Sequence, residues 1–188
     1  MKFIKPIAAF ALLCTICIAY NPIQLFDEPE EETPVVKTVD PKQLACMAKN
    51  IFYEAGQESV LGQAAVARVV MNRVNHGFAR TPCAVVYQAY TVEKVVDDET
   101  VKVKLCQFSW VCEGKGDPNT NSQRYKQAQQ VAYDVMAKDA YSDVVPNSAL
   151  FFHNLNVDPL WPYKQVAKIG NHIFYSKSKK KTNDGQRI

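Results

Sequence analysis

Glu54 is the residue of this sequence best suited to acid chemistry. It lies in the apolar segment IFYEAG, residues 51–56, and a helix predicted over this region would end just beyond it. Apolar neighbours and the negative end of a helix both disfavour an ionised carboxyl group and raise its pKa. A carboxyl group that is protonated near neutral pH can donate to the bridging oxygen of a glycoside. On position alone, a surface glutamate that ends a helix is the commoner interpretation.

Capping residues predict the helices that would position Glu54. The pair Asp40–Pro41 is typical of a helix start and Gly56 of a helix end, and Ser59 can cap a second helix that Gly77 ends. The helices predicted in the first half run from Asp40 to just beyond Glu54, from Ser59 to Gly77, and from Thr81–Pro82 to about Tyr90. Apolar residues of the second helix should alternate with polar faces.

The second half of the chain combines strand patterns with one helix. Residues 92–105, VEKVVDDETVKVKL, alternate branched and charged side chains around an acidic tetrad, which predicts an exposed hairpin. A loop is predicted over 113–121, a helix over 122–140, and short aromatic-rich strands within 144–175. The predicted fold class is therefore α+β, one helix-dominated domain with a small β region.

Charge is distributed unevenly along the 188 residues. Residues 41–176, the predicted domain, carry 14 basic and 12 acidic side chains, a net charge of +2. This near-neutral body argues against nucleic acid as a partner, although the basic tail at 177–188, predicted to be disordered, could contact an anionic polymer. Residues 27–40, DEPEEETPVVKTVD, read as an acidic, flexible tether.

The first 26 residues are typical of an export signal. Lys2 and Lys5 precede an uncharged stretch from Pro6 to Phe26, which is a cleavable signal peptide or a retained signal anchor in the inner membrane. Both alternatives export the domain, either into the periplasm or anchored to the inner membrane.

The cysteines agree with export. Four lie in the predicted domain, at positions 46, 83, 106 and 112. An even number in an oxidising compartment predicts two disulfides, and three pairings are open. We favour Cys46–Cys83 with Cys106–Cys112, because the second pair would close a small loop. A zinc site is disfavoured, because no CxxC spacing is present.

Four sequence elements, in order, resemble the cell-wall hydrolase family of the spore cortex-lytic enzyme type (SleB-like), also found in phage endolysins. They are the Glu-Ala element at Glu54 followed by GQAAVARVVMNRV, then QFSW at 107–110, ALFFHN at 149–154 and IGNHIFY at 169–175. The resemblance implies a lysozyme-like fold, cleavage of the bond between N-acetylmuramic acid and N-acetylglucosamine, and Glu54 as the catalytic acid. It makes peptidoglycan glycan strands the partner.

The same elements suggest groups for a sugar-binding groove, because amides and hydroxyls suit sugar hydroxyls and aromatic faces suit pyranose rings. The candidate substrate-binding residues are Gln107, Ser109, His153, Tyr163, His172 and Tyr175. The phenylalanines at 108, 151, 152 and 174 are expected to serve packing rather than contact, and Arg73 to form a surface salt bridge rather than to brace Glu54.

A second carboxylate is not evident in the sequence. Glu58, Glu113, Asp117 and Asp158 are the acids considered, and solvation is the simpler interpretation of the last three. This favours a lytic transglycosylase, which needs one carboxyl group, over a muramidase that hydrolyses the bond. No metal or other cofactor is expected, and we expect a monomer.

Two other functions stay open at this stage. One is a non-enzymatic cell-wall-binding envelope protein. The other is a secreted metallohydrolase that uses His76, His153 and His172 with Asp158, although the sequence has no close histidine pair. The small size of the chain favours a phage endolysin that acts in host lysis over a bacterial remodelling enzyme.

Overall fold

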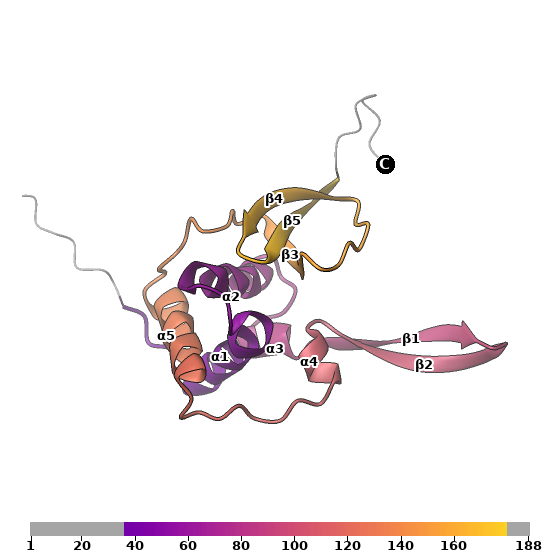
Figure 1. Cartoon of the computed structure of the whole chain (residues 1–188), viewed down its shortest axis with the longest axis horizontal. Coiled ribbons are helices and arrows are strands. Elements are labelled where there is room, and N and C mark those ends of the chain that lie inside the picture. Colours follow the sequence, from indigo (N-terminus) through magenta and orange to yellow (C-terminus); the bar gives the residue numbers. More distant parts are fainter. Residues whose placement is uncertain (1–35, 180–188) are drawn as a thin grey trace, which may run out of the picture. The chain divides into compact units, whose positions relative to one another are not determined.

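The computed structural model describes residues 36–179 (Figure 1). The predicted export segment at 1–26, the tether up to residue 35 and the tail from residue 180 lie outside the described residues. Within 36–179, no helix is long and apolar enough to cross a membrane. The mixed, helix-dominated α+β class predicted from the sequence is confirmed.

Helix α1, Pro41–Ala55, begins and ends where its capping residues predict. The Asp40 carboxylate accepts hydrogen bonds from the backbone N–H groups of Lys42 and Gln43, which removes two of the unpaired donors at the helix start. Met47, Ala48 and Ile51 of this helix are fully buried and belong to the main hydrophobic core. That core also contains residues of α2, α3 and α5, Gln123–Ala137.

Helix α2, Val60–Asn75, is buried on nearly every side. Ala64, Ala67 and Val70 face the main core, whereas Ala65 and Val69 belong to a second core formed with strands. Four polar residues of this helix are buried as well, so the polar faces predicted for it are covered along most of its length. The four are Gln63, Arg68, Asn72 and Arg73. Arg68, Asn72 and Arg73 donate to backbone carbonyls of the chain that follows, and Gln63 donates to the Glu58 carbonyl just before the helix.

Helix α3, Pro82–Val86, is shorter than predicted, because Tyr87 ends it and the chain enters a hairpin. Strand β1, Ala89–Val96, pairs antiparallel with β2, Glu99–Cys106. Asp97 and Asp98 form the two-residue turn with φ of 51° and 62°, the left-handed conformation that twisted hairpins require. The hairpin prediction is confirmed, with a turn of two residues instead of four.

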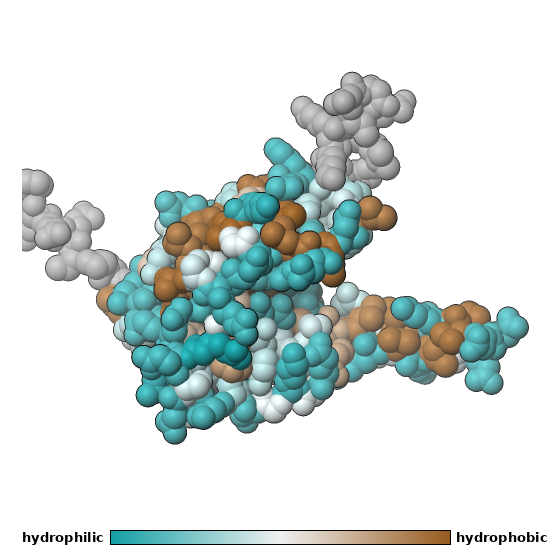
Figure 2. All heavy atoms as spheres, viewed as in Figure 1, coloured by the Kyte–Doolittle hydropathy of each residue, from teal (hydrophilic) through white to brown (hydrophobic). Residues whose placement is uncertain are grey.

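The hairpin extends away from the helices near α4, Ser109–Cys112 (Figure 1). Tyr90 pairs with Leu105 and Val92 with Val103, so these side chains share one face. Figure 2 shows apolar side chains along this arm, and Tyr90 and Val96 are about half exposed. The helical turn of α4 was not predicted, because four residues are too few for a periodic pattern.

Three antiparallel strands form the second sheet in the order β3-β5-β4. They are β3 Ala149–Asn154, β4 Tyr163–Ile169 and β5 His172–Lys179, and β5 enters the segment predicted as a tail. Phe174 of β5 is fully buried and packs with Ala65 and Val69 of α2 in the second core. The sheet therefore lies against α2, as Figure 1 also shows.

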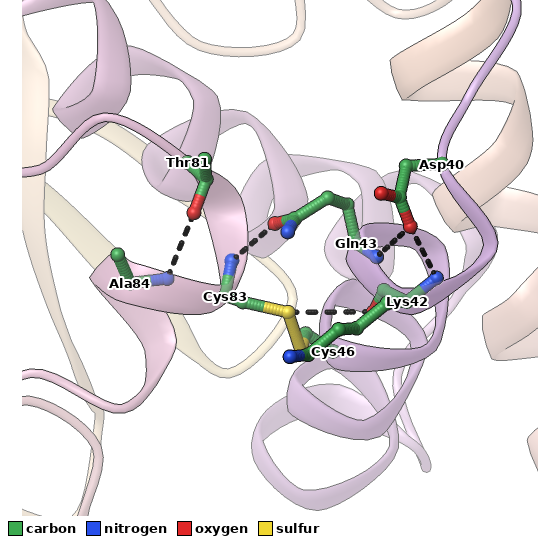
Figure 3. The surroundings of a disulfide bond; sticks show 7 residues. All are labelled: Asp40, Lys42, Gln43, Cys46, Thr81, Cys83 and Ala84. Atoms are coloured by element: carbon green, nitrogen blue, oxygen red, sulfur yellow. Dashed lines mark hydrogen bonds between the residues drawn. A yellow bond between two sulfur atoms is a disulfide. The ribbon is translucent and has the colours of Figure 1, made fainter.

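Two disulfides have the pairing favoured from the sequence. Cys46 of α1 is bonded to Cys83 of α3, and Cys106 of β2 is bonded to Cys112 of α4. Figure 3 shows the first bond beside the hydrogen bond from the Cys83 N–H to the Gln43 side chain, so that two interactions join α1 to α3. The second bond closes a loop that spans six positions of sequence.

We predict that the two disulfides contribute unequally to stability. The Cys46–Cys83 bond spans 37 positions and the Cys106–Cys112 bond only 6, so chain entropy assigns them about 4 and about 2 kcal/mol of the free energy of unfolding. Urea unfolding of the double alanine variant of each pair, compared with the oxidised wild type, measures these losses. A larger loss for the Cys106–Cys112 pair would contradict the prediction.

Candidate active site

Glu54 is half-buried in the last turn of α1 and lines two clefts. One, here called the charged cleft, has a volume of about 610 Å³ and is lined by Glu54, Glu58, Lys115, Arg124, Asn171 and His172, with their neighbours. The other, the aromatic cleft, has a volume of about 530 Å³ and is lined by Glu54, Gln107, Phe108, Phe151, Phe152 and Trp161, with theirs. Glu54, Asn154 and His172 line both, so Glu54 lies where the two clefts meet.

The pKa of Glu54 is raised to about 7. Burial of the carboxyl group is the largest cause, and the negative charge of Glu113 adds to it, whereas Lys115 and Arg73 oppose the shift. A carboxyl group with this pKa is substantially protonated at neutral pH and can both donate and accept a proton there. This is the property that the sequence predicted for Glu54.

Side chains of α1 hold in place the segment 109–117, which carries charged residues beside Glu54. The Trp110 indole donates to Asn50 at 3.1 Å and stacks on Tyr53 with ring centroids 4.9 Å apart. The Tyr53 hydroxyl donates to the Gly116 carbonyl at 2.7 Å, and Lys49 forms an ion pair with Asp117 at 2.8 Å. Residues 109–117 are therefore fixed along α1.

Glu113 and Lys115 belong to this fixed segment and influence Glu54 from it. Their side chains form an ion pair at 2.9 Å. Hydrogen bonds from Lys115 and Ser109 hold the pKa of Glu113 below its usual range, so that its carboxylate is charged when Glu54 titrates. Solvation was the simpler sequence interpretation of Glu113, and it overlooked this effect, because only the turn of α4 brings the carboxylate near Glu54.

Arg73 is the cation on the α2 side of Glu54. Its side chain is 3% exposed and donates from Nε to the Leu150 carbonyl at 2.7 Å, so the predicted surface salt bridge is wrong. Burial lowers the pKa of Arg73 to about 10, with the charge of Glu54 opposing that shift, and it stays a cation at neutral pH. The rejected alternative, that Arg73 braces the surroundings of Glu54, agrees better with this geometry.

Gln107 and Ser109 both line the aromatic cleft, as expected of sugar-binding candidates. The Gln107 amide lies 3.1 and 3.2 Å from the two terminal nitrogens of Arg73. A guanidinium group can only donate, so the amide oxygen faces Arg73 and the amide nitrogen remains available to another acceptor.

His153 and Tyr175 form a stacked, hydrogen-bonded pair. The rings lie 5.2 Å apart, His153 Nδ1 contacts the Asn154 carbonyl at 2.9 Å, and Nε2 contacts the Tyr175 hydroxyl at 2.8 Å. Because a carbonyl can only accept, Nδ1 donates to Asn154, and Nε2 shares the second hydrogen bond with the Tyr175 hydroxyl. His153 lines the aromatic cleft, and Tyr175 lines a smaller hollow with Trp161 and Asp158.

His172 lies beneath both clefts and is 4% exposed. Burial lowers its pKa below the usual value and the nearby Glu58 carboxylate opposes this shift, so the ring is neutral at pH 7. Glu58 accepts hydrogen bonds from the Asn171 side chain at 2.9 Å and its N–H at 3.3 Å, which ties the β4–β5 turn to the segment after α1. The same turn needs Gly170, whose φ is 55° and whose Cβ, if present, would meet the Glu58 carboxylate.

The structure separates Tyr163 from the other candidates. Its ring stacks on Phe151 with centroids 4.6 Å apart, and it lines neither cleft. The packing role predicted for the phenylalanines agrees with full burial of Phe174. It is incomplete for the other three, which line the aromatic cleft.

Sequence reasoning missed several cleft residues. They are Asn154, Asn171, Trp161, Lys115 and Arg124. Asn154 and Asn171 stand inside the quoted motifs and could have been found there, whereas Arg124 carries no sequence signal.

The histidine set of the metallohydrolase alternative is not gathered at these clefts. His76 contacts the Asn72 carbonyl at the end of α2 and lines neither cleft. In residues 36–179, no three His, Cys, Asp or Glu side chains are grouped to hold a metal ion.

The sequence matches the family described as Cell Wall Hydrolase over residues 57–175. The chain belongs to this family. The match begins three residues after Glu54, so the family assignment rests on both sheets and α2 rather than on the acid itself. Family membership makes this protein a peptidoglycan-degrading enzyme. A comparison with curated proteins found no match.

Two solved structures are similar to this chain, and the first of them supports the fold. The catalytic domain of the germination-specific lytic transglycosylase SleB from Bacillus anthracis superposes with a TM-score of 0.52 at 24% identity, over 74% of this chain and 98% of that one. The catalytic domain of the Bacillus cereus SleB protein gives a TM-score of 0.49 at 24% identity, over 78% of this chain and 99% of that one. The lysozyme-like fold expected from the sequence is confirmed.

We predict that the charges of residues 113 and 115 set the pKa of Glu54 in opposite directions. Glu113→Gln removes a neighbouring negative charge and should lower the pKa of Glu54, whereas Lys115→Met removes a positive charge and should raise it. Carboxyl-carbon NMR titration of the two variants measures both shifts. Lys126→Gln on the exposed side of α5 is the matched control and should leave the pKa in place. If the pKa of Glu54 is the same in all three variants, Glu113 and Lys115 do not influence it.

Proposed function

We propose that this enzyme cleaves the bond between N-acetylmuramic acid and N-acetylglucosamine by lytic transglycosylation, with Glu54 as the catalytic acid. The observation that carries the proposal is a carboxyl group with a pKa of about 7 at the meeting point of two clefts. A glycan strand that runs through both clefts would present a glycosidic oxygen to Glu54. The aromatic cleft offers rings and amides of the kind that bind pyranose rings.

The reaction needs one carboxyl group and no water. Glu54 donates its proton to the glycosidic oxygen as the bond to C1 of the muramic residue breaks, and the glucosamine residue leaves with a free hydroxyl. The C6 hydroxyl oxygen of the same muramic residue then bonds to C1. The Glu54 carboxylate takes the hydroxyl proton, which regenerates the acid and leaves a 1,6-anhydro end.

The neighbouring acids support this mechanism more than a two-carboxylate hydrolysis. Glu58 lines the charged cleft, but its two oxygens accept hydrogen bonds from Asn171. Glu113 is paired with Lys115, and Asp117 with Lys49. Because each of these carboxylates has a structural partner, none is poised as an unengaged base across the sugar.

Export and the biological role are proposed on the sequence. The apolar segment at 1–26 supports action outside the cytoplasm, in the periplasm or at the inner membrane, where the two disulfides would be stable. A role as a phage endolysin acting in host lysis is proposed on the family resemblance, because phage endolysins are among the proteins that this family includes.

Glu54→Gln should abolish catalysis while the protein stays folded, because the amide cannot donate an acidic proton. We expect clearing of a peptidoglycan suspension to slow by roughly 10²–10⁴-fold. Mass spectrometry of the products released by the wild type should find 1,6-anhydro muramic ends. Reducing muramic ends would show that the enzyme hydrolyses the bond instead. Equal clearing by the wild type and Glu54→Gln would show that Glu54 is not the catalytic acid.

Activity should fall as the pH rises through about 7, because the donor is the protonated form of Glu54 and its pKa is about 7. Each further pH unit then costs about tenfold in kcat/KM. Initial rates of product release at several pH values on either side of neutrality measure this fall in activity. In Glu113→Gln, where the pKa of Glu54 is expected to be lower, the fall in activity should occur at lower pH. If the fall stays at the same pH, a group other than Glu54 causes it.

A further inference from the structure

Arg124 is a cation of the charged cleft that has no anionic partner among residues 36–179. It lies in the first turn of α5 and lines the cleft together with Lys115 and Glu54. The other cations near Glu54 are engaged: Lys115 is paired with Glu113, and Arg73 donates to the Leu150 carbonyl. For Arg124, neither an ion pair nor a side-chain hydrogen bond exists within the described part of the chain.

The Arg124 side chain is nevertheless held in one place. Its guanidinium carbon lies 4.1 Å from the centroid of the Phe52 ring, a cation–π contact. A Cβ atom at position 56 would lie 3.1 Å from Arg124 Nε and 3.2 Å from Cδ. Gly56 therefore leaves the room that Arg124 occupies, two residues after Glu54. Because the Arg124 side chain is already ordered, it loses less conformational entropy when it binds a ligand.

A guanidinium group in this state is suited to a carboxylate. It has five N–H donors in a planar fork that can bind both oxygens of a carboxylate at once, and stacking on Phe52 leaves the edge of that fork available. Lys115 is the other cation that lines this cleft, and it is already paired with Glu113. The aromatic cleft, in contrast, is lined mainly by rings and amides, which suit uncharged sugars.

We propose that Arg124 binds a carboxylate of the peptide stem of peptidoglycan, while the glycan strand passes Glu54. The inference rests on the proposed function, which places the strand in both clefts. In intact peptidoglycan the lactyl group of the muramic residue is joined to the stem as an amide, so the free carboxylates of the polymer belong to the peptide. The charged cleft is therefore the stem-binding side of the site, and Arg124 is its specificity-determining residue.

The test is a cycle of two enzymes and two substrates. The substrates are peptidoglycan with its native stem carboxylates and the same peptidoglycan after conversion of these groups to neutral amides. The wild type should cleave the amidated polymer roughly tenfold more slowly in kcat/KM, the size expected for one charged hydrogen bond in a partly exposed cleft. Arg124→Gln should show this loss on the native polymer and no further loss after amidation.

Two further variants sharpen the cycle. Arg124→Lys keeps the charge without the planar fork and should recover only part of the preference for the native polymer. Lys126→Gln, two residues along α5, removes a cation that lines neither cleft and should keep the full wild-type preference. Circular dichroism and thermal unfolding of all variants show that differences in rate are not differences in folding.

The outcomes separate this inference from the proposed function. If Arg124→Gln slows cleavage of both polymers by the same factor, or of neither, the stem-binding role is wrong while glycan cleavage by Glu54 stands. If the wild type releases no glycan fragments from either polymer, or Glu54→Gln releases as much as the wild type, the proposed function itself is wrong. A wild type that does not distinguish the two polymers also overturns the inference.

Discussion

The contact between α2 and β3 is the interaction on which the rest of the structure depends. Asn72 donates to the carbonyls of Pro146 and Ala149 at 3.2 and 3.0 Å, and Arg73 donates to that of Leu150 at 2.7 Å. These buried donors pair with carbonyls at and just before the start of β3, an edge strand of its sheet. The sheet is thereby fixed to the helix whose other face packs against α1, so the two walls of the clefts cannot move independently.

That constraint explains why Glu54 can be held in an unfavourable state. Its carboxyl group loses solvation at the end of an apolar helix and faces the charge of Glu113, and both raise its pKa. Arg73 and Lys115 limit the shift, so that the group titrates near neutral pH instead of remaining permanently protonated. The aromatic contacts of Tyr53 and Trp110 hold residues 109–117 in place, and so the shift is a fixed property of the fold.

The two clefts present two kinds of surface on either side of Glu54. Rings and amides from β3, residues 107–109 and Trp161 form the aromatic side, whereas charged groups from the α1–α2 segment, residue 115 and α5 form the other. Among residues 36–179, only Glu54, Asn154 and His172 line both clefts. The proposed function and the proposed stem contact together place Glu54 between a sugar-binding side and a peptide-binding side, which would couple binding of the peptide to cleavage of the adjacent glycan.

Local rules in the sequence determined the helix caps, the hairpin, the family and the choice of Glu54. Asp40, Gly56 and Ser59 act within a few residues of themselves, and the acid stands in a motif that can be read directly. The sequence alone left three disulfide pairings open and could not show that α2 is buried on its polar side. The roles of Arg73, Glu113 and Arg124 also required the tertiary structure, because each depends on a partner distant in sequence. Burial and the distances between charges depend on how the chain packs, so these residues come together around Glu54 only in the folded protein.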